Sequence, residues 1–192
     1  VGNGTYVKNA VRLVDIDNGA SREIVPAEFQ PEAPFWSPDG KSVATFATSH
    51  GRRVLLVVDA TNGKRREFTA GVVQTCCVHG ESQGLEWSPD GKSIAFQGEY
   101  REPLRVIELA TGAVRQVGVR ATLIGEYRWS SDSRALQYTA TTSPLDVFRT
   151  IREATLDGND RVLIDRLPNG AGTAGMRSDT TAVVSSDSGV FM

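Results

Sequence analysis

One stretch of this sequence matches a catalytic motif: Gly80-Glu81-Ser82-Gln83-Gly84. Gly-x-Ser-x-Gly is the nucleophile elbow of serine hydrolases, where a strand before the serine and a helix after it expose the hydroxyl and supply an oxyanion N–H. The residues that follow, Leu85-Glu86-Trp87, lead into a Ser-Pro-Asp-Gly turn, so we expect a strand there instead of a helix. Both histidines, His50 and His79, precede Ser82, so the Ser…Asp…His order is also missing. We therefore predict no catalytic residue and no enzymatic activity in this chain.

Metal-binding chemistry has two candidates in the sequence. Cys76-Cys77 with His79 lack the second cysteine pair and the spacing of a zinc site, and side chains of neighbouring residues in an extended chain point apart, which disfavours a disulfide between them. Asp15, Asp17 and Asn18 lack the order and the distal glutamate of an EF-hand. We read the cysteines as structural or exposed thiols and Asn18-Gly19 as a hairpin turn, and we predict no metal and no cofactor.

A repeated unit organises the chain. Trp-Ser-Pro-Asp-Gly-Lys stands at 36–41 and again at 87–92, and weaker copies begin at Trp129 and Met176, so the aligned positions are separated by 51, 42 and 47 residues. Proline presets the first turn position, aspartate bonds its own backbone and glycine accepts a positive φ, so each copy predicts a tight turn between two paired strands. The tryptophan at the same place in three copies predicts packing between neighbouring sheets.

A second turn marker follows each tryptophan, 26, 24 and 28 residues later, at Asn62-Gly63, Thr111-Gly112 and Asp157-Gly158. β-type runs flank these markers, so one unit reads as strand a, tight turn, strand b, longer loop, strand c, tight turn and strand d. Stacked four-stranded units of this length are typical of propeller blades.

The predicted fold is therefore all-β: a β-propeller of four-stranded antiparallel blades, with about four blade equivalents in 192 residues. The expected parts of this single propeller region are a half blade at 1–25, three blades at 33–68, 84–118 and 126–165, and a partial blade at 173–192. Because both ends fall within a unit, we expect an open arc or a fragment of a larger propeller, which would self-associate through its open blade edges.

The repeats resemble the WD-like repeats of TolB-type propellers, which share the Trp-Ser-Pro-Asp-Gly-Lys hairpin and a later Asp/Asn/Thr-Gly turn. The resemblance spans nearly the whole chain and departs from the pattern in the last two units, whose first turns lack proline and glycine. Related propellers occur in translocation-associated periplasmic proteins, sensor ectodomains and the gating domains of prolyl-oligopeptidase-like enzymes. The resemblance thus implies the fold and a periplasmic or extracytoplasmic location, and leaves the function open.

Composition excludes several classes of protein. With 40% hydrophobic and 23% charged residues, and with no apolar run long enough to cross a bilayer, the chain reads as a soluble globular protein without membrane insertion. A net charge of −2 gives no reason to expect nucleic acid. The basic clusters Arg52-Arg53 and Lys64-Arg65-Arg66 lie beside predicted turns, where we expect solvated faces. The start at Val1 suggests a processed or truncated chain.

Binding residues are expected on the longer loops. In an antiparallel meander the tight a–b and c–d turns share one end of the blades, and the longer b–c and d–a loops share the other, where binding side chains are usually carried. The candidates there are His50, Arg52, His79, Glu81, Glu99, Tyr100 and Arg101.

The leading hypothesis for the function is a non-catalytic, TolB-like scaffold that binds a protein or peptide. The alternative is the propeller part of a prolyl-oligopeptidase-like serine hydrolase whose catalytic domain lies outside this chain. An enzyme complete in itself is disfavoured, because no constellation of His, Asp and Glu occurs at a usable spacing.

Overall fold

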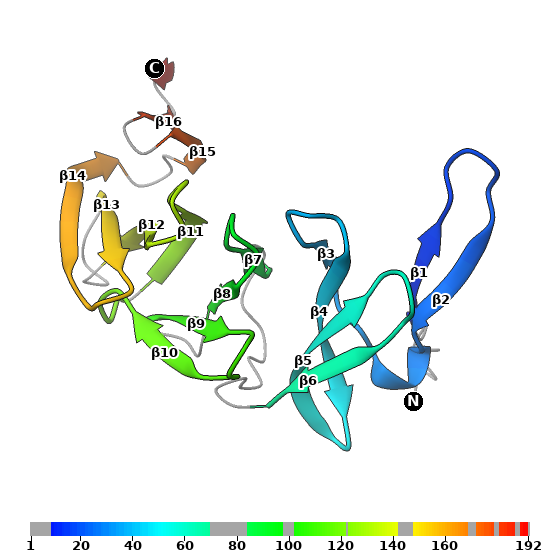
Figure 1. The fold of residues 1–192 in the computed structure, drawn as a ribbon. Coiled ribbons are helices and arrows are strands. Elements are labelled where there is room, and N and C mark those ends of the chain that lie inside the picture. The colour runs from blue at the N-terminus through cyan, green and yellow to red at the C-terminus, as the bar shows by residue number, and fades with distance from the viewer. Residues whose placement is uncertain are drawn as a thin grey trace, which may run out of the picture. The chain divides into compact units, whose positions relative to one another are not determined.

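The computed structural model describes residues 9–69, 84–97, 102–121, 123–141, 148–168, 172–178, 181–186 and 189–191 (Figure 1). These residues form β-strands, with one 3-10 turn, η1 (Ala27–Phe29). None of them belongs to a helix that is long and apolar enough to span a membrane. Each sheet is an antiparallel meander in which consecutive strands are neighbours, as predicted for propeller blades.

The chain divides into two compact units, Val1–Gln74 and Thr75–Met192. The first unit holds a two-stranded sheet, β1 (Val11–Val14) and β2 (Ser21–Val25), and a four-stranded sheet, β3 (Phe35–Trp36), β4 (Ser42–Ser49), β5 (Arg52–Asp59) and β6 (Arg65–Phe68). Its core joins Val11, Ile24 and Val25 to Val43, Ala47, Val54, Leu56 and Val58. The two sheets of this unit therefore bury apolar side chains against each other.

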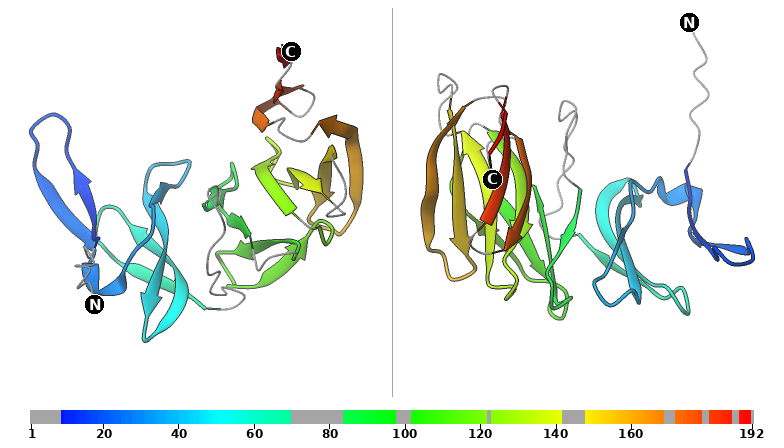
Figure 2. Two further views of the ribbon diagram at one scale, coloured as in Figure 1. Left: turned by 180° about the vertical axis from the view of Figure 1, so that it is seen from behind. Right: turned by 90° about the horizontal axis from the view of Figure 1, so that it is seen from above.

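The second unit holds two four-stranded sheets and one three-stranded sheet (Figure 2). Their strands are β7 (Glu86–Trp87), β8 (Ser93–Gln97), β9 (Leu104–Glu108) and β10 (Val114–Val117), then β11 (Leu123–Trp129), β12 (Ala135–Thr141), β13 (Phe148–Thr155) and β14 (Asp160–Pro168), and last β15 (Gly172–Ser178), β16 (Thr181–Ser186) and β17 (Gly189–Phe191). Side chains of the first two sheets share one apolar core, which includes Leu104, Val106, Tyr127, Leu136 and Tyr138.

The predicted turns between strands a and b are present. In the first copy the Ser37 hydroxyl donates to Asp39 Oδ1 at 2.7 Å and accepts the Ser42 N–H at 2.9 Å, and Gly40 has φ +67°. Such a φ carries no Cβ clash in glycine, which confirms the reason for glycine in this turn. The second copy repeats these bonds from Ser88 to Asp90 and Ser93.

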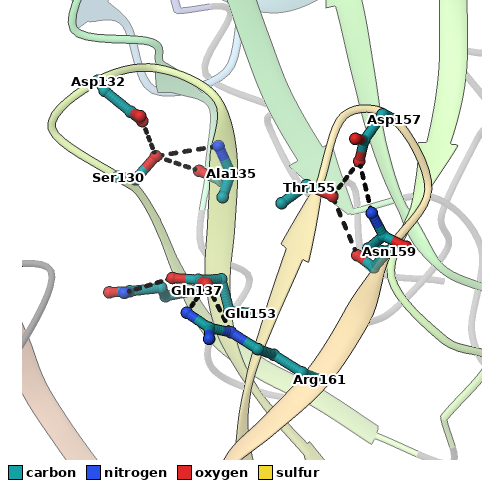
Figure 3. A network of polar contacts seen from close by, with 9 residues as sticks. All are labelled: Ser130, Asp132, Ala135, Gln137, Glu153, Thr155, Asp157, Asn159 and Arg161. Atoms are coloured by element: carbon teal, nitrogen blue, oxygen red, sulfur yellow. Dashed lines mark hydrogen bonds and ion pairs between the residues drawn. The ribbon is translucent and has the colours of Figure 1, made fainter.

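The third copy keeps this geometry without proline or glycine. Ser130 donates to Asp132 Oδ1 at 2.7 Å and exchanges bonds with Ala135, as Figure 3 shows. Ser133 occupies the glycine position with φ +62°. The departure from the repeat pattern therefore changes the residues of this turn and leaves its backbone path unchanged. The turn residues of the fourth copy, 179–180, lie outside the described part of the chain.

The second set of turns is present as well. Gly63, Gly112 and Gly158 have φ of +73°, +74° and +103°, and the N–H of Gly63 donates to the carbonyl of Asp59 at 2.9 Å. The first turn of this kind, Asp15 to Ala20, is the predicted hairpin: the Asp15 carboxylate accepts the Asp17 N–H at 2.9 Å. That carboxylate is thus used in closing the turn.

Candidate functional site

Two of the predicted loop residues lie in the described part of the chain. His50 and Gly51 form a two-residue turn between β4 and β5, with Ser49 paired to Arg52 and with φ of +50° and +74°. This b–c connection is as tight as the other turns, which corrects the expectation of a longer loop there. Positive φ at both central residues matches a two-residue hairpin turn, for which His50 was not an obvious sequence signal.

The charged side chain next to this turn makes contacts within the first unit. Arg53, next to Arg52, donates from Nε and Nη2 to the two carboxylate oxygens of Glu32, each at 2.9 Å, and its guanidinium lies 3.8 Å from the centroid of the Phe46 ring. Arg53 therefore links the segment before β3 to β5 and packs on the Phe46 ring of β4. His50 and Arg52 themselves are exposed. The remaining candidates, His79, Glu81, Glu99, Tyr100 and Arg101, lie outside the described residues, so binding at this loop end stays a prediction.

The catalytic and metal-site hypotheses fall largely on residues that are not described. Ser82, Cys76 and Cys77 lie outside the described ranges. The predicted strand after this segment is present, since β7 pairs Glu86 with Ala95. That Ser82 is not catalytic stays a prediction. Within the described residues, no group of three His, Cys, Asp or Glu side chains could hold a metal ion.

The first unit carries a hollow of about 460 Å³ beside its two-stranded sheet. It lies at the end of the a–b and c–d turns, opposite to the end that the sequence favoured. The side chains that line it come from β1, the turn after it, β2 and β3; they are Leu13, Val14, Asp15, Ala20, Ser21, Arg22 and Trp36. The lining is thus mainly apolar, with one aromatic ring and two charged groups of opposite sign.

Trp36 differs from its repeat counterpart Trp129. The Trp129 side chain is 8% exposed, and its Nε1 donates to the carbonyl oxygen of Glu86, in strand a of the preceding sheet, at 3.0 Å. Trp36 is 54% exposed and faces the hollow. The sheet next to Trp36, β1 with β2, contains only strands c and d, so a strand equivalent to β7 is missing from the described residues there. The hollow lies where that strand would pack.

The edge of β1 offers hydrogen-bonding groups at the same place. Asp15 N–H donates to the carbonyl of Ala20 at 2.8 Å. Because an antiparallel ladder alternates, the N–H and C=O of Val14 and of Arg12 point away from β2. Among the described strands β2 alone pairs with β1. The exposed side chains of Val14 (59%) and Ile16 (95%) add apolar surface next to this edge.

The charged groups at the hollow are held in position. Arg22 donates from Nη2 to the carbonyl of Thr61 at 3.3 Å, in the turn between β5 and β6. Arg12 and Glu23, across the β1–β2 pair, lie 3.7 Å apart. Of the two charged groups that line the hollow, Arg22 is thus held by the Thr61 carbonyl, and the Asp15 carboxylate accepts the Asp17 N–H at 2.9 Å. The apolar lining includes the Trp36 ring and the side chains of Leu13 and Val14. This arrangement suits an apolar side chain carried by an extended peptide backbone.

Sequence reasoning did not single out Trp36 as the lining of a hollow, for an identifiable reason. Its motif is the same as that of Trp87 and Trp129, and that motif predicts a packed side chain. The signal that could have singled it out is the composition of the first unit, since among its described residues 9–25 form strands c and d and no strand a precedes β3 there.

The comparisons with known proteins support the fold. No family model and no curated sequence matches the chain. Among solved structures, putative TolB from Agrobacterium tumefaciens superposes with a TM-score of 0.55 at 17% identity, over 86% of this chain and 61% of that one. The β-propeller domain of the trilobed protease from Pyrococcus furiosus gives 0.61 at 12% identity, over 94% and 62%. Acylaminoacyl peptidase from Pyrococcus horikoshii gives 0.57 at 18%, over 80% and 27%.

The chain therefore spans less than two thirds of the length of each of these proteins. At such low identity the likeness concerns the fold alone. Together with the meander sheets, it identifies the chain as a β-propeller region similar in fold to TolB and to the propeller domains of peptidases.

Proposed function

We propose that this chain is a non-catalytic β-propeller scaffold that binds a protein partner through an extended segment, and that the Trp36 hollow with the edge of β1 is the place of binding. The observation that carries the proposal is the contrast between Trp36, which is 54% exposed, and Trp129, which is buried at the same position of another sheet. An exposed sheet edge can accept an extended peptide as an added strand, and an aromatic ring in a hollow beside the edge can pack against alternate side chains of that peptide.

Main-chain groups would bind the backbone of the segment, and side-chain groups would select its residues. The outward N–H and C=O groups of Arg12 and Val14 would pair with the backbone of the bound segment, which supplies affinity without regard to sequence. Alternate side chains of that segment would enter the hollow against Trp36 and Leu13, which favours apolar residues at every second position. The bound segment thus would take the place that strands a and b occupy in a complete blade.

Selection of a displayed library of extended ten-residue peptides on the purified chain tests this proposal. We expect the selected peptides to alternate apolar and polar residues, and to bind Trp36→Ala at least about tenfold more weakly than the unchanged chain. Val14→Pro, which removes one outward N–H from the edge of β1, should weaken binding similarly.

The matched control is the double variant His50→Ala and Arg52→Ala, at the opposite end of the same unit. We expect this variant to bind the selected peptides as the unchanged chain does. If it loses binding while Trp36→Ala keeps it, the interaction surface lies at the b–c turn, and the proposal for the hollow is wrong.

A second candidate function is the propeller part of a prolyl-oligopeptidase-like serine hydrolase. The likeness in fold to acylaminoacyl peptidase supports it. In that case the catalytic domain would lie outside this chain, and the coding sequence that flanks it would encode a hydrolase domain. Reading that sequence separates the two candidates, because a scaffold of the first kind needs no such domain.

A further inference from the structure

Strand β14 exposes three consecutive apolar side chains on the outer strand of its sheet. Val162, Leu163 and Ile164 are 45%, 38% and 41% exposed. β14 is the last strand of the order β11-β12-β13-β14, and no described strand pairs with its outer edge. Long apolar edge strands are templates for pairing with another chain.

The outer strands of the other four-stranded sheets are different. β6 and β10 have four residues each, whereas β14 has nine. In β6 the apolar Phe68 is buried and Arg65, Arg66 and Glu67 are exposed. In β10 the exposed residues are Arg115 and Gln116. Short, polar edges protect against pairing, so β14 stands apart from its two repeat equivalents.

The sequence of β14 is complementary to itself in the antiparallel direction. It reads Asp-Arg-Val-Leu-Ile-Asp-Arg from 160 to 166. Two copies that pair with Leu163 opposite Leu163 also place Val162 opposite Ile164, Arg161 opposite Asp165, and Asp160 opposite Arg166. Every charge then meets an opposite charge, and the apolar residues meet at the centre. Directly opposed residues of antiparallel strands are close enough for these contacts.

We propose that two copies of this chain dimerise through β14, with the two strands antiparallel across a two-fold axis at Leu163. The interface is isologous, because each copy offers the same strand to the other. It lies in the second unit and does not involve the Trp36 hollow, so either proposal can fail without the other.

The contacts of β14 within its own sheet leave the charged side chains of Arg161 and Asp165 available for the second copy. Arg161 donates from Nε to Glu153 Oε1 at 2.9 Å within its own sheet (Figure 3), and its side chain remains 71% exposed. A guanidinium carries five N–H groups, so Arg161 can bond Glu153 and a second carboxylate together. Asp165 is exposed. Asp160 is held by Arg152 and is largely buried, so the pair of Arg161 with Asp165 is the main polar contact, and it occurs twice by symmetry.

The strand is irregular at the centre of this pairing. β13 pairs Arg152 with Val162 and the adjacent Ile151 with Ile164, so Leu163 is an extra residue of β14. A second register shift lies between Ile164 and Leu167, where Arg166 has φ +62°. Such a bulge breaks the alternation of side chains, and residues 161–166 are all exposed. It also limits the regular backbone pairing, so we expect a dissociation constant of about micromolar size from an interface smaller than the standard class.

Sedimentation velocity over a concentration series, with two charge variants, tests the dimer. Asp165→Arg sets arginine against Arg161, and Arg161→Asp sets aspartate against Asp165, so each variant alone should dimerise at least about tenfold more weakly. An equimolar mixture restores both opposite-charge pairs in the heterodimer, and we expect dimers to return on mixing. Loss of folding in either variant cannot produce that recovery.

Cross-linking tests the register. In a background with Cys76→Ser and Cys77→Ser, Leu163→Cys lies opposite its own copy and should form a covalent dimer on mild oxidation. Glu67→Cys, on the polar outer strand β6, is the control and should stay largely monomeric. A chain that stays monomeric throughout the series, a dimer that both charge variants leave unchanged, or equal cross-linking at the two positions overturns the proposal. Pairing of the β14 edge with an extended peptide alone, without self-association, also overturns it.

Discussion

The indole Nε1 of Trp129 donates to the carbonyl oxygen of Glu86 at 3.0 Å, and the two residues lie 43 positions apart in the chain. The Tyr127 hydroxyl donates to the carbonyl of Gly84, and the Asp90 N–H donates to Ser133 Oγ at 3.0 Å; both of these pairs are also 43 positions apart. The constant separation means that the two sheets meet at one sequence offset, one residue longer than the 42-residue spacing of Trp87 and Trp129.

The first prediction concerns this tryptophan. Trp129→Phe removes the N–H and leaves the Glu86 carbonyl without this partner, so we expect a loss of about 1–3 kcal/mol in the free energy of unfolding of the second unit. Trp36→Phe is the matched control: its side chain is half exposed, and we expect a change within about 0.5 kcal/mol. Urea unfolding followed by circular dichroism measures both. Equal losses would show that the Trp129 bond contributes nothing beyond ring packing.

The second prediction concerns the turn glycines and Ser133. Gly91 has φ +69°, so Gly91→Ala should destabilise the fold by about 1 kcal/mol. Ser133 has φ +62° at the equivalent position, where its hydroxyl accepts the Asp90 N–H. Ser133→Ala loses that bond and keeps the strain, whereas Ser133→Gly loses the bond and relieves the strain. The glycine variant should therefore be more stable than the alanine variant by about 1 kcal/mol in the same unfolding experiment. An alanine variant as stable as the glycine variant would refute the role of φ.

The third prediction concerns acid. Hydrogen bonds from Ser37, Ser88 and Ser130, together with backbone N–H groups, lower the pKa of Asp39, Asp90 and Asp132 below the ordinary 3.8. A carboxylate with a lowered pKa in the folded state stabilises the fold above pH about 4, and this contribution disappears as the pH falls through the lowered pKa.

We therefore expect the urea concentration at the midpoint of unfolding to decrease as the pH is lowered from 5 to the most acidic conditions that keep the chain in solution. This range is chosen around the unfolded pKa of about 4. Asp90→Asn should be less stable than the unchanged chain at neutral pH and should approach it in acid. A stability difference that does not depend on pH would contradict the assignment.

The fourth prediction concerns alkali. Burial raises the pKa of Tyr138 to about 12, and the hydrogen bond to Asp160 adds to this effect. Burial raises the pKa of Tyr127 as well, and the negative charge of Glu86 raises it further. A raised pKa means that each tyrosine stabilises the fold below its unfolded value of about 10, and that this stabilisation is lost as the pH rises through the folded value.

Phenolate absorbance and circular dichroism, recorded in one titration, check this. We expect the late phase of tyrosine ionisation to coincide with loss of the β signal, and Tyr138→Phe to reduce the amplitude of that late phase. Ionisation of all tyrosines near pH 10, with the β signal intact, would show that neither phenol is protected.

The sequence predicted the hairpins well because turn chemistry is local. Ser37 to Gly40 and Asn62-Gly63 carry within a few residues all the groups that fix the backbone. His50 could not be predicted in this way, because histidine at φ +50° is no turn signal and the tight β4–β5 connection is set by the pairing of two eight-residue strands.

The candidate site was predictable only in part, since the exposure of Trp36 depends on which strands of the neighbouring sheet pack against it. Trp36 and Trp129 share one motif, and the difference between them lies in the neighbouring sheet, 43 positions upstream for Trp129. The self-complementarity of 160–166 is visible in the sequence once β14 is known to be an exposed outer strand. Exposure is a property of packing, which a strand's own residues do not specify.

The bonds at a constant 43-residue separation also bear on how such a chain can evolve. The sheet of β7 to β10 offers the carbonyl groups of Gly84 and Glu86 to the sheet that follows it, and that sheet supplies the donors from Tyr127 and Trp129. A duplicated copy of the segment that carries these donors and acceptors would bring both sides of this contact with it. Gene duplication can therefore change the number of blades without any new interface having to arise by point mutation.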